Sequence, residues 1–71
     1  MATKAEAIAM LAKIPDNEPV FVMRGQDRLA PNLVDYWAGA AEARGTPPGK
    51  VAEARACAVA MRAWPRRKWP D

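Results

Sequence analysis

The residues of this chain whose types and spacing could do chemistry are two carboxylates, Asp35 and Glu42. They stand seven positions apart, so on a helix they share one face and are separated by about 10.5 Å along its axis. Paired carboxylates can act as general acid and base, but this spacing is more typical of a solvated helix face. We therefore expect a protein that is not an enzyme.

The rest of the composition excludes the commonest catalytic and metal sites. The chain has no histidine and one cysteine, Cys57, so a tetrahedral zinc site, a Ser-His-Asp triad and a Cys-His dyad cannot be built. Cys57 lies between alanines in a helical segment, where a small buried apolar residue is expected rather than a reactive thiol. No cofactor is predicted.

The length predicts one small domain with a thin core. A chain of 71 residues buries only about 60% of the surface that it exposes when unfolded. No apolar run reaches the roughly eighteen residues needed to span a bilayer, and residues 1–13 lack the order of a secretory signal. We expect a cytoplasmic protein without membrane contact.

Three segments carry helix signals. The first opens with a capping box formed by Thr3 and Glu6, and the second opens with a proline and ends at Gly45. The third is expected to be capped by the hydroxyl of Thr46. The predicted fold is mainly α, a small three-helix domain with one short extended or β segment. Its helices are expected over 3–14, 30–44 and 47–63, within a single helical domain of residues 1–63.

The predicted core centres on Trp37, the largest apolar side chain of the second helix. One face of the first helix is expected to pack in the core, because Ile8, Leu11 and Ile14, with Ala7, recur at helical spacing. The third helix is either contacted from two sides or simply rich in alanine, because it has two apolar stripes. One consists of Val51, Ala54, Ala58 and Met61, and the other of Ala52, Ala56, Val59 and Ala63.

Residues 20–23, Val-Phe-Val-Met, are the only run rich in β-formers. A lone strand leaves backbone donors and acceptors without partners. Three solutions stay open: an extended segment that lines the core, a two-fold strand pair in a homodimer, or pairing with a strand of another protein.

The net charge lies at the C-terminus. Residues 1–61 hold seven Lys/Arg and seven Asp/Glu, whereas residues 62–71 hold four cations and one carboxylate, which gives the net +3. Two tryptophans bracket these cations, so the basic tail over 64–71 could bind an anionic partner or fold back onto the helices. The candidate contact residues here are Arg62, Trp64, Arg66, Arg67, Lys68 and Trp69.

A more specific pattern lies in the order of residues from Pro15 onward. A Glu-Pro-Val-Phe-Val run over 18–22 is followed by Gln26-Asp27, Ala30-Pro31, Trp37, Trp64 and the closing Pro70-Asp71. In this order the chain resembles a family of short uncharacterised proteins encoded by phages and prophages of proteobacteria.

The resemblance implies a protein of the host bacterium's cytoplasm that occludes a host machine, by analogy of genetic context an anti-CRISPR protein against a type I surveillance complex. Nucleic-acid-handling surfaces are basic, so the expected contacts are the acidic groups Asp16, Glu18, Asp35 and Glu42. Two alternatives stay open: a nucleic-acid-binding accessory protein that uses the tail, and a homodimeric structural component joined through residues 20–23.

Overall fold

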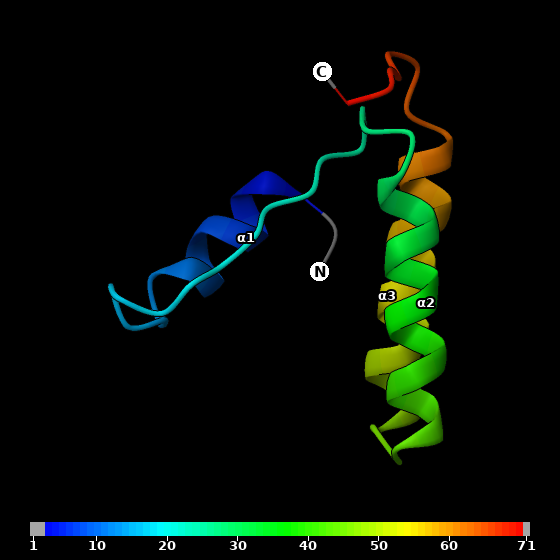
Figure 1. Cartoon of the computed structure of the whole chain (residues 1–71). Coiled ribbons are helices and arrows are strands. Elements are labelled where there is room, and N and C mark those ends of the chain that lie inside the picture. Colours follow the sequence, from blue (N-terminus) through cyan, green and yellow to red (C-terminus); the bar gives the residue numbers. More distant parts are fainter. Residues whose placement is uncertain (1–2, 71) are drawn as a thin grey trace.

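The computed structural model describes residues 3–70 and contains three helices (Figure 1). They are α1 (Lys4–Leu11), α2 (Ala30–Ala43) and α3 (Pro48–Arg62). The mainly α-helical fold is as predicted, and each helix falls within its expected segment. Among the described residues, no helix has the length and apolar character that crossing a membrane requires.

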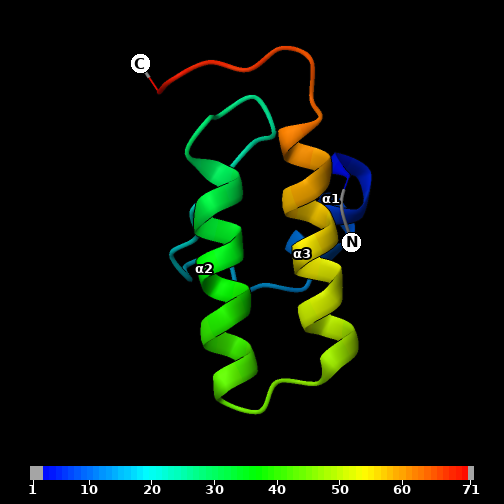
Figure 2. The same ribbon diagram turned by 90° about the vertical axis from the view of Figure 1, so that its right-hand side faces the viewer.

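Helices α2 and α3 lie side by side as a hairpin (Figures 1 and 2). Gly45, at φ 88°, provides the left-handed residue that ends α2. The contact between the helices is made of small side chains: Ala30, Ala38 and Ala58 are fully buried, and Val51 is 1% exposed. Small residues let helix backbones approach closely, but each of them buries little apolar area.

The predicted N-cap of α1 is confirmed, and the predicted N-cap of α3 is wrong. At α1 the backbone N–H of Glu6 donates to the Thr3 hydroxyl at 3.4 Å, as expected of the capping box. At α3 the N-cap is Pro47, with no side-chain hydrogen bond. The backbone N–H of Thr46 instead donates to the Ala41 carbonyl at 3.0 Å, so this residue closes the end of α2.

The prediction that Trp37 centres the core is wrong, because this side chain is 49% exposed. Helix α2 has two apolar stripes, and the one with the small buried residues Ala30, Pro31 and Ala38 faces α3. The stripe with the larger side chains is left on the outside. The hydrophobic content of α2 is therefore largely on the surface.

Residues 4–23, which we call the arm, project from the hairpin (Figure 1). Helix α1 has no buried residues, and within residues 3–70 it packs against neither of the other helices, so its predicted packing on the core is wrong. Residues 20–23 run without assigned strand structure. Phe21 is 86% exposed, which excludes the first of the three solutions, an extended segment that lines the core.

The alanine contact makes a direct prediction about stability. Ala38→Leu should lower the free energy of unfolding by about 1–3 kcal/mol, because the extra methylenes would force α2 and α3 apart. Ala40→Leu is the matched control, since Ala40 is exposed on the same helix. Urea denaturation followed by circular dichroism measures both; equal midpoints for the two variants would contradict this packing.

Candidate interaction surface

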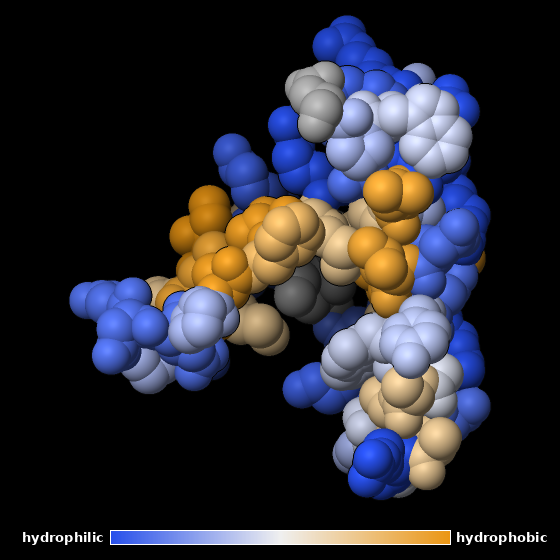
Figure 3. All heavy atoms as spheres, viewed as in Figure 1, coloured by the Kyte–Doolittle hydropathy of each residue, from blue (hydrophilic) through white to orange (hydrophobic). Residues whose placement is uncertain are grey.

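The exposed apolar stripe of α2 is formed by Leu29, Leu33, Tyr36 and Trp37. Leu29 is the residue that caps α2, and the other three follow it at i+4, i+7 and i+8, which places all four on one side of the helix. Tyr36 is 79% exposed and the other three are about half exposed. We call these four residues the α2 stripe. Apolar side chains gather both on the hairpin and on the arm (Figure 3).

The loop before α2 is tied to the C-terminal tail by backbone hydrogen bonds. The N–H of Arg28 donates to the carbonyl of Lys68 at 2.9 Å, and the N–H of Lys68 donates to the carbonyl of Gln26 at 2.6 Å. These bonds form an isolated parallel β-bridge between Asp27 and Lys68. The tail is therefore an ordered part of the fold up to this bridge.

Arg67 adds side-chain hydrogen bonds, which we call the clamp, to this junction between the tail and the loop before α2. Its guanidinium donates to the carbonyl of Gly25 at 3.4 Å and to that of Asp27 at 3.3 Å, with both bonds partly buried. Asp27 in turn accepts the N–H of Leu29 on its carboxylate at 2.8 Å. The junction therefore fixes the residue at which the α2 stripe begins.

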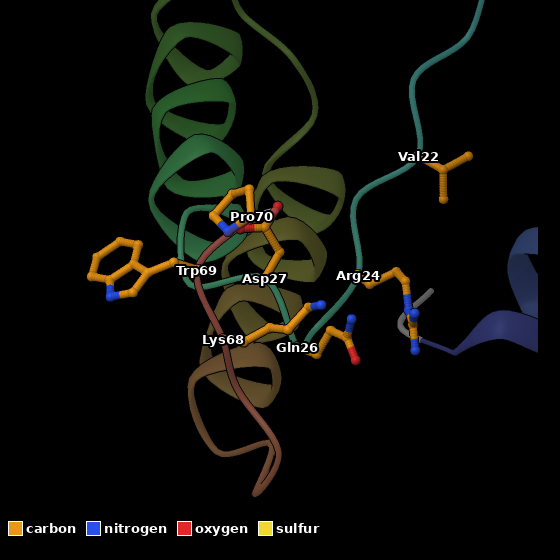
Figure 4. Close-up of a pocket in the computed structure, with 7 residues that line it drawn as sticks. All are labelled: Val22, Arg24, Gln26, Asp27, Lys68, Trp69 and Pro70. Carbon is orange, nitrogen blue, oxygen red and sulfur yellow. The ribbon is translucent and has the colours of Figure 1, made fainter.

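Trp69 lies at that end of the α2 stripe. Its ring lies beneath the Arg28 guanidinium, whose central carbon is 5.6 Å from the ring centroid, a cation–π contact. The indole is directed away from the other side chains that line the neighbouring pocket (Figure 4) and is 63% exposed. Arg28 directly precedes Leu29, so this cation–π pair lies next along the chain to the first residue of the α2 stripe.

A shallow depression of about 360 Å³ lies beside the junction (Figure 4). It brings two cationic side chains and one carboxylate to the same opening, so it suits a small polar group with negative charge. Its lining residues are Val22, Arg24, Gln26, Asp27, Lys68, Trp69 and Pro70. Within residues 3–70, no three potential ligands among His, Cys, Asp and Glu stand together in a way that could hold a metal ion.

The four acidic residues predicted to contact a partner do not form one patch. Asp35 pairs with Arg62 at 2.7 Å, and Arg62 also donates to the Asn32 side chain at 2.9 Å. Glu42 accepts two hydrogen bonds from Arg55, each 3.2 Å. Both pairs link α2 to α3, whereas the other two acidic residues, Asp16 and Glu18, are exposed in the arm.

The pairing with Arg55 changes the acid–base behaviour of Glu42. The hydrogen bonds from Arg55 lower the pKa of Glu42, and the positive charge of Arg55 lowers it further. The same contacts raise the pKa of Arg55. Since Glu42 is exposed, the effect on stability is small and screened by salt.

The predicted tail residues divide into two groups. Arg62 and Arg67 are engaged within the fold, by the Asp35 ion pair and by the two carbonyls. Trp64, Arg66, Lys68 and Trp69 are exposed. Sequence reasoning missed the α2 stripe as a surface, although the presence of two apolar stripes on one helix was the signal that could have revealed it.

No family model matches this chain, and neither a curated protein nor a solved structure does.

The role of Arg67 can be separated from that of its neighbour. Arg67→Ala should lower the free energy of unfolding by about 1 kcal/mol, because two partly buried carbonyls lose a charged donor. Arg66→Ala removes the same charge from an exposed side chain and should change stability little. Chemical denaturation followed by tryptophan fluorescence distinguishes them; equal losses would argue against the clamp.

The Glu42–Arg55 pair predicts a pH dependence. A carboxylate whose pKa is lowered by folding contributes stability above its unfolded pKa, and the contribution is lost as pH falls through the folded value. Glu42→Gln should therefore lower the thermal midpoint at neutral pH and have no effect well below pH ~4. An equal effect of the substitution at both pH values would exclude the ion pair as its cause.

Proposed function

We propose that this protein is a non-enzymatic binding protein that occludes a surface of a host defence complex, and that its target is a type I CRISPR surveillance complex. The observation that supports a protein target is the α2 stripe, an exposed apolar surface with the cation–π pair of Arg28 and Trp69 next to it along the chain. Contiguous exposed apolar surfaces typically mark protein interaction sites. The choice of target rests on the resemblance to phage and prophage proteins.

The side chains of this surface are of the types that dominate binding energy. Tryptophan, tyrosine and arginine are enriched among the few interface residues that carry most of the affinity. Tyr36 and Trp37 stand next to each other on α2, and Arg28 stacks on Trp69 at its start. Aromatic side chains lose little conformational freedom when they are buried, so a small rigid protein can obtain useful affinity from them.

The acidic groups have a secondary place in this proposal. Asp35 and Glu42 are already paired with arginines of α3, so a basic partner would have to compete with an internal arginine for each of them. Both carboxylates stabilise the hairpin that presents the α2 stripe. A rigid hairpin favours occlusion, because less conformational freedom is lost on binding.

A second candidate function is nucleic-acid binding by the tail, which the exposure of Trp64 and Trp69 favours. Stacking on indoles and phosphate contacts by cations are the usual basis of single-strand binding. However, Arg62 and Arg67 are engaged within the fold, so at most two of the four cations remain for direct phosphate contacts. Two contacts predict that a fourfold rise in salt weakens single-strand binding only about sevenfold.

A nuclease-treated pull-down tests the proposed function. Tagged protein is exposed to lysate from a bacterium with an active type I system, and recovered subunits are identified by mass spectrometry. Recovery of the surveillance complex in a fixed ratio supports the proposal, and its affinity is then measured with the purified complex. Nucleic acid recovered only without nuclease, and no protein with it, would favour the second candidate.

Variants of the α2 stripe locate the interface. Trp37→Ala should weaken binding to the purified complex by about 2 kcal/mol, roughly thirtyfold, as expected of a central interface residue. Val59→Ala is the control, because Val59 is an exposed apolar residue of α3. Both variants should keep the helical circular dichroism spectrum. Undiminished binding by Trp37→Ala would remove the α2 stripe from the interface.

A further inference from the structure

Residues 19–23 are an extended segment whose backbone has no hydrogen-bond partner among residues 3–70. The segment runs alongside α1 in the arm (Figure 1). Val20, Phe21 and Val22 are 55%, 86% and 68% exposed. A run of β-forming residues with free backbone groups is a template for pairing with another strand.

We propose that two copies of this chain pair through residues 18–24 as antiparallel strands around a two-fold axis at Phe21. A second copy of the chain fits this segment because the run is nearly self-complementary in this register. With Phe21 opposite Phe21 of the second copy, Val20 lies opposite Val22. At the ends of the pair, Glu18 lies opposite Arg24.

The end pairs supply charge complementarity. Within residues 3–70, neither Glu18 nor Arg24 forms a side-chain hydrogen bond or ion pair, so both are available to a second copy. The two-fold axis forms the pair twice, once at each end. Opposite charges directly across an antiparallel pair stabilise it, and like charges in the same positions destabilise it.

Proline at position 19 fits one of the two hydrogen-bonding patterns of this register. Opposed residues in antiparallel strands alternate between pairs that exchange backbone hydrogen bonds and pairs that do not. If Phe21 occupies a non-bonded pair, then Val20 and Val22 exchange hydrogen bonds. Pro19, opposite Met23, then falls in a non-bonded pair, where its missing N–H is no loss.

This pattern also accounts for the apolar surface of the arm. Side chains are closest in non-bonded pairs, so the two Phe21 rings would lie together, on the same face as Met23. Phe21, Val22 and Met23 line a depression of about 250 Å³ whose other wall is formed by Ala7, Met10 and Leu11 of α1. The second copy would add apolar cover to the face of α1 that the hairpin leaves bare.

Other registers lose the pairing of Glu18 with Arg24, the pairing of Val20 with Val22, or both. A parallel pair in register would put Glu18 beside Glu18 and Arg24 beside Arg24, with like charges at both ends. A shift by one residue would turn every side chain to the other face. The antiparallel register about Phe21 pairs both the charges and the valines.

The dimer goes beyond the proposed function and does not depend on it. The pairing uses the arm, whereas the proposed target contact uses α2 and Trp69. A dimer would present the α2 stripe twice and could gain avidity on a complex with repeated subunits.

Charge reversal tests the register in the full chain. Sedimentation equilibrium should show a dimer for the wild type, and Glu18→Arg or Arg24→Glu alone should raise its dissociation constant about tenfold or more. The double variant E18R/R24E should restore the dimer. A mixture of the two single variants should also restore it, as a heterodimer with both end pairs reformed.

Two further variants separate this register from folding and from general charge effects. Asp16→Arg makes the same charge change two residues away, in the exposed turn of the arm, and should leave the dimer intact. Phe21→Glu places two carboxylates together at the axis and should give a monomer with an unchanged helical spectrum. A wild-type monomer at every concentration overturns the proposal, as does a dimer that is indifferent to both reversals at 18 and 24.

Discussion

The contact between α2 and α3 is made of small side chains, mostly alanines, and most other features of the molecule depend on it. Ala30, Ala38 and Ala58 are fully buried there, and they let the two helices approach closely. A close approach leaves no room between the helices for a tryptophan. The large apolar side chains of α2 are therefore on the outside, so the thin core and the apolar surface have one physical cause. A small core supplies little stability, and the two exposed ion pairs between the helices add only a small amount.

The second constraint is the junction between the tail and the loop before α2. Arg67 and the Asp27–Lys68 bridge hold residues 25–28 against the end of the chain. The same residues connect the arm to the hairpin, so the hydrogen bonds of Arg67 fix the point at which the arm leaves the hairpin. It also places Trp69 at the start of the α2 stripe. The basic tail and the loop before α2 are thus one structural unit.

The helices could be predicted from the sequence because their ends carry local signals, such as Thr3 with Glu6 and the glycine at 45. The position of Trp37 could not, because helical spacing identifies a stripe but not the neighbour that it faces. The choice between the two stripes of α2 depends on α3, whose buried face holds Val51 and Ala58 and matches small side chains. The role of Arg67 could not be predicted either. Its acceptors are backbone carbonyls, and every residue has one, so no residue type marks the acceptor position.

The run at residues 20–23 was recognised as strand-like, and its isolation is what makes the charges around it informative. An exposed β-forming segment risks open-ended stacking, which proceeds by parallel, in-register pairing in many fibres. That arrangement would align Glu18 with Glu18 and Arg24 with Arg24 in every layer, so repulsion accumulates as the stack grows. Antiparallel pairing about Phe21 forms two attractive pairs, and its two-fold symmetry closes after two copies. The same two charges thus oppose the fibre and favour the dimer, which gives a physical reason for their positions on either side of the run.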